Sequence, residues 1–195
     1  MRTSKKDSLK THLRPGGVYR RSDVEKFSRS VDRDLAQLVK EGTLVKVRQG
    51  LYRCPERSRF GVLPARADKL VKTFLKEDDF LLTSPNDYNS LGVGTTQLYN
   101  HYVVYNHKRH GTFELDDQTF EFRKTPRFPK KLTAEFLLVE LLNNLEQIAE
   151  DRNAVMERVK EKAKKMNARV LRSAVKRFSK VSTKKFLEGA LCEQP

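Results

Sequence analysis

The chain has 195 residues, of which 37% are hydrophobic and 33% charged, a composition typical of a soluble protein with one domain or two small ones. No run approaches the ~18 apolar residues of a membrane span, and the charged N-terminus lacks the apolar stretch of a secretory signal. We therefore expect a cytoplasmic protein with no membrane partner, in which Cys54 and Cys192 are free thiols.

The net charge of +15 is unevenly distributed along the chain. Residues 1–62 hold 16 Lys and Arg against 7 Asp and Glu, residues 63–128 hold 9 of each, and residues 129–195 hold 15 against 9. Such a cationic balance favours nucleic acid or another anionic surface as partner. Because the excess is largest in the first third, we expect that part to contact the anionic partner.

The first third predicts two helices followed by a β-hairpin. A short helix is expected over residues 22–27, with Ser22 as its N-cap. A second helix is expected over residues 28–42 and ends at Gly42, a residue that readily takes the left-handed conformation after a helix. The order of helix, turn, helix and two-stranded hairpin predicts a winged helix-turn-helix domain over residues 1–60.

The middle third predicts a small mixed α/β domain over residues 61–128. Its pattern contains an amphipathic helix over residues 63–76, a strand over 100–107 and a hairpin over 112–124 that turns at an Asp-Asp pair. The overall fold class is therefore α+β.

The last third, residues 129–195, predicts helices throughout. From Thr133, a good N-cap, the apolar face is broad enough to require packing, so we expect these helices to pack on the middle domain. After Asp151 the helices become basic, and a last short helix is expected over residues 182–191.

The second helix of the first third has two distinct faces. At ~100° per residue, one face holds the apolar residues Val31, Leu35, Leu38 and Val39. The other face holds the candidate DNA-binding residues Arg29, Ser30, Arg33, Gln37 and Lys40. Arg can bind guanine edges or phosphates, Gln can pair with adenine, and Lys prefers phosphate. A charged face is also typical of ordinary solvated helices, but the adjoining hairpin and the local charge favour a helix that enters the major groove.

The stretch "KVRQGLYRCP" predicts the wing. With Gln49-Gly50 as a two-residue turn, the expected pairs are Arg48 with Leu51, Val47 with Tyr52, Lys46 with Arg53 and Val45 with Cys54. Lys46, Arg48 and Arg53 then share one face, where we expect them to contact the DNA backbone or the minor groove. A three-residue turn would shift these pairs.

The N-terminal third resembles the winged helix of AbiEi-type (abortive infection) antitoxins of bacterial toxin–antitoxin systems. The family pattern is a helix ending in L-x-x-L-V-x-x-G, a short basic strand, R-x-G-x-Y and a proline. In this chain it corresponds to Leu35, Leu38, Val39, Gly42, Arg48, Gly50, Tyr52 and Pro55. The segments "SPNDYNSLGVGTTQLYNHYVVYN", "GTFELDDQTFEFRKTP" and "VSTKKFLEGAL" are similar to a subgroup of the family.

The resemblance implies a DNA-binding antitoxin that represses its own operon at inverted repeats of the promoter, as a monomer or homodimer. It also implies a nucleotidyltransferase toxin that the antitoxin counteracts, with or without direct contact. Residues 152–195, with 13 Lys and Arg against 4 Asp and Glu, depart from the family pattern.

No catalytic constellation is evident in the sequence. His101, His107 and His110 lack Cys or carboxylate partners at the spacing of a zinc site, and no nucleophile–base set is found. We therefore expect no enzyme activity, no metal and no cofactor, which argues against a nucleic-acid-modifying enzyme.

An alternative is an RNA-binding or ribonucleoprotein accessory protein. It would use the basic C-terminal helices together with Tyr99, Tyr102 and Tyr105, whose rings can stack on bases. Tyrosines in a strand are, however, also ordinary packing residues.

Overall fold

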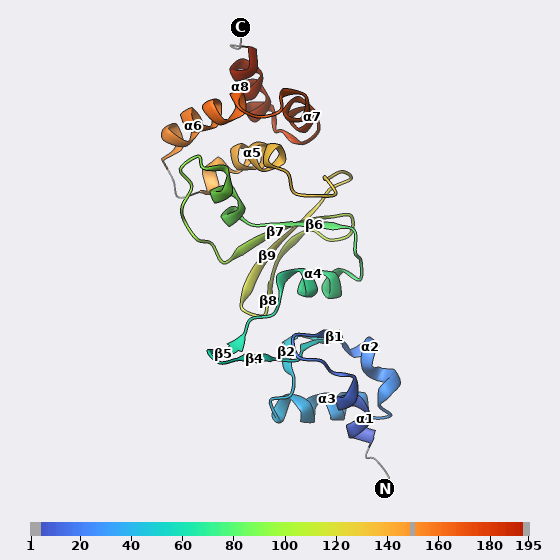
Figure 1. Cartoon of the computed structure of the whole chain (residues 1–195). Coiled ribbons are helices and arrows are strands. Elements are labelled where there is room, and N and C mark those ends of the chain that lie inside the picture. Colours follow the sequence, from blue (N-terminus) through green and yellow to red (C-terminus); the bar gives the residue numbers. More distant parts are fainter. Residues whose placement is uncertain (1–4, 149–150, 193–195) are drawn as a thin grey trace. The chain divides into compact units, whose positions relative to one another are not determined.

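The computed structural model describes residues 5–148 and 151–192 of the chain (Figure 1). The chain divides into two compact units. Unit 1 holds Met1–Asp79 and Phe113–Gln118, and unit 2 holds Phe80–Thr112 and Thr119–Pro195. Both α and β structure are present, consistent with the predicted α+β class, and the described elements after β9 are helical.

This division differs from the three ranges expected from the sequence. The helix over Ala67–Leu75 packs against the N-terminal elements. The side-chain amide of Gln118 donates to the carbonyl of Ala65 at 3.0 Å. The C-terminal helices share one core with a segment of the middle third that includes Tyr88 and Leu91. Contacts between residues distant in sequence therefore determine the two units, and these units do not coincide with the ranges expected from composition and charge.

Unit 1 begins with three helices, a 3-10 turn and a small sheet. In chain order these are α1 (Lys5–His12), β1 (Val18–Arg20), α2 (Arg21–Val24), η1 (Glu25–Phe27), α3 (Val31–Lys40), β2 (Val45–Arg48) and β3 (Leu51–Arg53). The strands form an antiparallel sheet in the order β1-β3-β2. The elements enclose a core of Leu9, Leu13, Val24, Val31, Leu35, Leu38 and Leu44.

The two predicted helices form with modified ends. Helix α2 begins at Arg21, because the backbone amide of Arg20 donates to the Asp23 carboxylate at 3.1 Å, so the expected N-cap at Ser22 was wrong. Helix α3 covers the central part of the range 28–42. Its last residue is Lys40, and Gly42 stops the helix as predicted: its φ is +71° and the amide of the next residue bonds back into the last turn.

A second hairpin follows the first sheet and was not anticipated. It consists of β4 (Glu56–Ser58) and β5 (Gly61–Leu63), and α4 (Ala67–Leu75) begins only after Pro64. The segment "ERSRFGVL" lacks the apolar alternation that announces a half-buried strand, since even Phe60 is 85% exposed.

The four-stranded sheet has the order β6-β7-β9-β8. Its strands are β6 (Phe80–Thr83), β7 (His101–Asn106), β8 (Gly111–Leu115) and β9 (Gln118–Lys124), with β7 parallel to β9 and antiparallel to β6. The predicted strand over 100–107 and the hairpin over 112–124 are confirmed. Asp116 and Asp117 take φ values of 52° and 61°, which is the geometry of a tight two-residue turn.

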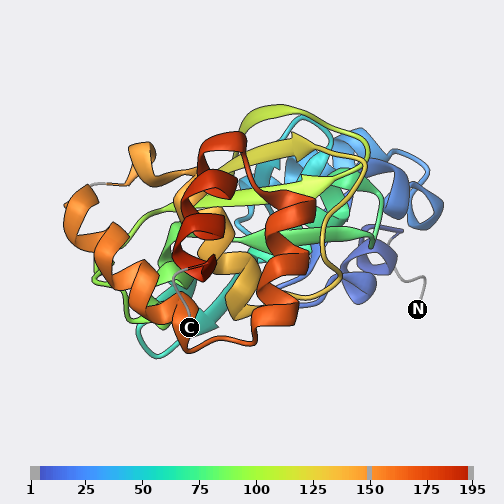
Figure 2. The same cartoon turned by 90° about the horizontal axis from the view of Figure 1, so that it is seen from above.

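Unit 2 is completed by the 3-10 segment η2 (Pro85–Leu91) and the C-terminal helices. These are α5 (Ala134–Asn143), the 3-10 turn η3 (Leu145–Gln147), α6 (Arg152–Lys164), α7 (Ala168–Phe178) and α8 (Val181–Cys192). The hydroxyl of Thr133 accepts from the amide of Phe136 at 3.2 Å, so the predicted cap is confirmed. Helices α6, α7 and α8 pack against α5, whose residues 136–141 are buried (Figures 1 and 2).

Among the helices of the described residues, none has both the length and the apolar character needed to cross a membrane. Cys54 is a free thiol, and partial burial raises the pKa of this thiol. The side chain of Cys192 lies outside the part of the chain whose side chains the structure describes.

A buried polar network joins the sheet of unit 2 to α5. The carboxylate of Glu140 accepts from Tyr105, from Arg123 at 2.9 Å and from Asn144 at 2.7 Å. Arg123 also pairs with Glu121 at 2.7 Å, and this hydrogen bond holds the pKa of the Glu121 carboxyl below its usual value. Burial raises the pKa of the Tyr105 phenol, which therefore remains a neutral donor.

The Glu121→Gln variant should lose stability at neutral pH but not at acidic pH. A carboxyl whose pKa is lowered on folding stabilises the fold above its unfolded pKa, and this contribution disappears as the pH falls through the folded pKa. Urea unfolding at pH 7 should show a loss on the order of 1 kcal/mol, which shrinks towards zero near pH 3. Glu146→Gln, whose side chain is 83% exposed, serves as the control. An equal loss for Glu121→Gln at both pH values would contradict the electrostatic cause.

Candidate nucleic-acid interface

The outer face of α3 presents Arg33, Gln37 and Lys40, whereas Arg29 and Ser30, expected on the same helix, lie just before its first residue. Arg29, Ser30, Arg33, Gln37 and Lys40 are all exposed, and the Arg33 side chain is 80% exposed. The opposite face is fixed by Leu35 and Leu38, which are at most 1% exposed. Since the apolar face allows α3 only one orientation against the core, the polar face is directed to solvent.

The two acidic residues of α3 bind mainly to residues outside its polar face, although Asp34 also lies 4.0 Å from the Arg33 guanidinium. Arg21 binds the Asp32 carboxylate through two hydrogen bonds of 2.7 and 2.9 Å, which lower the pKa of that carboxyl. Asp34 is 7% exposed and accepts from the Ser28 hydroxyl at 2.6 Å. Both carboxylates are therefore hydrogen-bonded by neighbours near the start of the helix. Negative charge at this end also interacts favourably with the helix dipole.

The hairpin of β2 and β3 has a different register from the predicted one. Arg48 faces Leu51 across the Gln49-Gly50 turn as expected, and Gly50 has φ of +72°. A bulge between Lys46 and Arg48 then shifts the pairing, so that Lys46 faces Tyr52 instead of Arg53. One extra residue in β2 is sufficient to change every pair beyond the bulge.

The shift removes Arg53 from the face that it was expected to share with Lys46 and Arg48. Its side chain is 13% exposed and pairs with Asp116, whose side chain is 5% exposed, at 2.5 Å. The other oxygen of Asp116 accepts from the amide of Ala65 at 3.0 Å, and Arg53 also donates to the carbonyl of Leu63 at 3.4 Å. Arg53 thus joins β3 to the hairpin loops of unit 1 and is engaged in packing.

Lys46 and Arg48 remain exposed on the hairpin. The guanidinium of Arg48 lies 5.1 Å from the ring centre of Phe113 and 6.0 Å from that of Phe74. Cation–π contacts of this kind restrain the side chain while its charge stays accessible. The β2-β3 hairpin therefore exposes two of the three cations that were expected on one face.

A second cationic face lies on α7 in unit 2. We name Arg169, Arg172, Lys176 and Arg177 the α7 face; all four are exposed, and within the described residues none of them forms an ion pair. Leu171 and Val175 are buried on the opposite side of the helix. The sequence revealed the basic excess of this region, and helical spacing of i, i+3, i+7 and i+8 was the signal for a single face.

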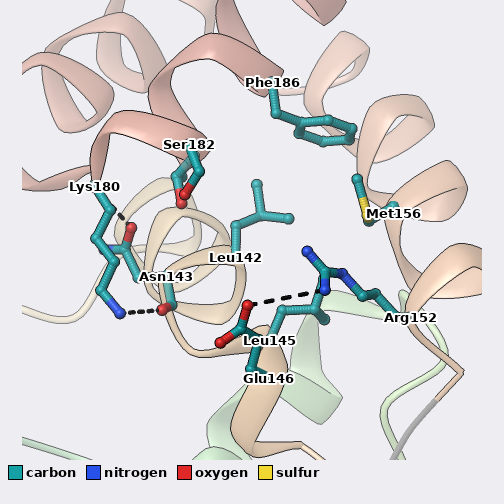
Figure 3. Close-up of a pocket in the computed structure, with 10 residues that line it drawn as sticks. Leu142, Asn143, Leu145, Glu146, Arg152, Met156, Lys180, Ser182 and Phe186 are labelled. Atoms are coloured by element: carbon teal, nitrogen blue, oxygen red, sulfur yellow. Dashed lines mark hydrogen bonds and ion pairs between the residues drawn. The ribbon is translucent and has the colours of Figure 1, made fainter.

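A cavity of about 270 Å³ lies between α5, α6 and α8 (Figure 3). Leu142, Met156 and Phe186 line it with apolar groups. Its polar rim is satisfied internally: the Lys180 ammonium donates to the carbonyl of Asn143 at 2.6 Å, and Glu146 lies 3.9 Å from Arg152 (Figure 3). The arrangement contains no nucleophile next to a base among these lining residues.

The histidines considered as metal ligands are dispersed among structural contacts. Among the residues that the structure describes, no group of three or more His, Cys, Asp or Glu is positioned to hold a metal ion. His101 lies 3.8 Å from Glu121, and a ring nitrogen of His107 lies 2.9 Å from the carbonyl of Thr125.

Removing either partner of the Arg53–Asp116 pair should destabilise unit 1. Because each single change leaves the other charge buried, Arg53→Ala and Asp116→Ala should each lower the free energy of unfolding by about 3 kcal/mol, and the double variant should lose less than the sum. Urea unfolding of the four proteins measures this coupling. Lys46→Ala, at an exposed position, should stay within about 0.5 kcal/mol of the parent. Additive losses for the pair would show that the two side chains do not stabilise each other.

No known family model matches the chain, and no curated protein does either. Among solved structures, it is similar to the crystal structure of the RV2827C protein from Mycobacterium tuberculosis, with a TM-score of 0.63 and 12% sequence identity. The similarity covers 96% of this chain and 74% of that chain. At this identity the likeness is one of fold, and it extends over both units.

Proposed function

We propose that unit 1 is a winged helix-turn-helix module that binds duplex DNA, with α3 in the major groove. The observation that carries the proposal is the polar face of α3 with the residue that precedes it: Arg29, Arg33, Gln37 and Lys40 are exposed, Asp32 is bound by Arg21, and Asp34 is buried and accepts from Ser28, 4.0 Å from Arg33. The element order α1-β1-α2-α3-β2-β3 supports it, because α2 and α3 stand in the position of the two helices and β2-β3 in that of the wing.

The residues of this face suit different parts of the duplex. Arg33 and Gln37 are separated by one helical turn, so both can reach base edges in one groove, where Arg pairs with guanine and Gln with adenine. Arg29 and Ser30, just before α3, and Lys40, at its last residue, suit phosphate contacts, as do Lys46 and Arg48 on the proposed wing. Arg53 is not part of the proposed interface, because its charge is paired with Asp116.

The biological role we propose is that of a cytoplasmic antitoxin and repressor of its own operon. The support is the sequence motif from Leu35 to Pro55, which resembles AbiEi-type antitoxins. By that resemblance the operator consists of inverted repeats, bound by a monomer or homodimer, and the counteracted toxin is a nucleotidyltransferase. Neither role requires a cofactor or a catalytic group on this chain.

RNA binding is a second candidate function, and the observation that favours it is the α7 face. Four exposed cations on one helix attract any polyanion, and they belong to unit 2, outside the proposed winged helix. A gel-shift series on the full chain separates the two candidates by comparing a duplex of the operon's promoter, a random duplex and a structured RNA. Preference for the promoter duplex supports the repressor, and preference for the structured RNA would overturn it.

The Arg33→Ala/Gln37→Ala variant should lose discrimination between promoter and random duplex. Each base contact is worth about 1–3 kcal/mol of discrimination, so the ratio of the two dissociation constants should fall at least tenfold. The matched control is Arg152→Ala/Gln147→Ala, which removes one exposed arginine and one exposed glutamine side chain from unit 2. Equal losses of affinity on both duplexes would contradict a reading role for α3.

The Lys46→Ala variant should weaken binding to both duplexes alike. Loss of one phosphate contact should reduce the slope of log affinity against log salt concentration by ~0.9. Arg53→Ala, compared under conditions where it remains folded, should leave this slope unchanged because its guanidinium is paired. An equal decrease in slope for the two variants would place Arg53 at the DNA after all.

A further inference from the structure

We propose that unit 2 contains a binding site for single-stranded nucleic acid, in which the α7 face binds phosphates and an adjacent aromatic pocket takes one unstacked base. This inference rests on the second candidate function, which it deepens, and is independent of the duplex binding proposed for unit 1. It combines two features of unit 2 that the proposed repressor role does not use: a cationic face without ion pairs, and a polar aromatic pocket at its end.

The pocket has a volume of about 200 Å³, a size suited to a single base. It is built from β7, the segment after β9, α5 and the end of α7, and its lining residues are Tyr105, Thr125, Arg127, Phe128, Phe136, Glu140, Arg177, Phe178 and Ser179. Arg177 belongs both to this lining and to the α7 face, so the phosphate-binding cations continue to the mouth of the pocket.

Aromatic rings make up much of the wall. Phe136 meets Tyr105 edge to face at 5.9 Å and Phe178 at 5.3 Å between ring centres, so these three rings hold one another in place. Phe128 is half-buried and stacks on His107 at 4.8 Å. Rings fixed in this way offer a base a stacking surface without the entropy cost of ordering it.

The buried end of the pocket provides a hydrogen-bond acceptor. The side chain of Glu140 is 4% exposed, and Tyr105, Arg123 and Asn144 all donate to its Oε1. Among the described residues no donor is assigned to Oε2, so this oxygen can accept from an N–H group of a ligand. The exocyclic amino groups of cytosine and adenine are such donors.

The charges at the site select among ligand classes. Arg127 and Arg177 are exposed at the mouth and, with Arg123 beside Glu140, disfavour a cation. An acidic side chain would be attracted by the two mouth arginines but would meet the Glu140 carboxylate at the buried end. A nucleotide satisfies both ends, since its phosphate is anionic and its base is neutral and donates hydrogen bonds. The length of the α7 face, which spans two turns of helix from Arg169 to Arg177, favours a strand over a free nucleotide.

The test is fluorescence anisotropy of the full chain with labelled 12-nucleotide strands of RNA and DNA and with a duplex of equal length. Phe128→Ala should weaken binding of oligo-C roughly tenfold by removing a stacking surface, with an unchanged salt slope and unchanged duplex affinity. Arg172→Ala and Lys176→Ala should each lower the salt slope by ~0.7, the value for one single-strand phosphate contact. Oligo-C should bind more tightly than oligo-U, because uracil lacks the amino donor. The RNA and DNA arms show which sugar the site prefers.

Two matched controls accompany these variants. Leu98→Ala, the control for Phe128→Ala, removes an apolar side chain from a residue that is 83% exposed. Lys185→Ala, the control for the cation variants, removes an exposed cation of α8 outside the α7 face. Arg33→Ala/Gln37→Ala should leave single-strand affinity unchanged, so failure of the unit 1 proposal and failure of this one are separable. Urea midpoints for every variant exclude loss of folding as the cause.

Several outcomes would overturn the inference. These are no binding of single strands, a Phe128→Ala affinity equal to that of Leu98→Ala, equal binding of oligo-C and oligo-U, or an equal loss on the duplex. Competition by cytidine monophosphate as effective as that by the strand would instead make the pocket a free-nucleotide site. Competition by polyglutamate of matched length as effective as that by the strand would indicate an acidic protein partner.

Discussion

The buried ion pair of Arg53 and Asp116 is the interaction on which unit 1 depends. Its partners lie 63 residues apart in sequence, and Asp116 also binds the backbone of Ala65. The pair therefore ties three segments together: the last strand of the first sheet, the approach to α4, and the turn between β8 and β9. Two charges taken out of water are stable only when each has its partner, so the pair also fixes the turn in one position.

In both units, several carboxylates accept hydrogen bonds from neighbouring donors within the fold. In unit 1, Asp32, Asp34 and Asp116 are held by neighbouring donors, and in unit 2 Glu140 is buried beneath three donors. Among the described residues the cations of the α7 face form no ion pair, and on the outer α3 face Arg33 alone has an acidic neighbour, Asp34 at 4.0 Å. These carboxylates therefore serve structural contacts, while two helices, one in each unit, present exposed cations to a polyanion.

Local patterns in the sequence predicted those features that local physics determines. The amphipathic face of α3, its end at Gly42, the cap at Thr133 and the Asp-Asp turn all follow from helix periodicity, capping and turn preferences, and all are confirmed. The exposure of the candidate residues on α3 could be predicted for the same reason.

Features set by distant contacts could not be predicted in this way. The bulge in β2 moves Arg53 from the expected exposed face into a pair with Asp116, and no local signal marks either event. The hairpin of β4 and β5 has no apolar alternation, and the division into two units depends on where the segment 113–118 packs. The net charge of residues 129–195 does not predict the α7 face, because a surface depends on which side of the helix each charge takes, and only the helical spacing carries that information.

The position of the segment 113–118 has a consequence for how the protein is made. Unit 1 cannot be completed when its first 79 residues have left the ribosome, because Asp116 is still to be synthesised. Until then Arg53 lacks its partner, and the helix proposed to bind DNA belongs to an unfinished unit. Completion of the N-terminal unit is thereby coupled to translation of most of the sheet of unit 2, so a chain interrupted before that point would leave Arg53 as an uncompensated charge.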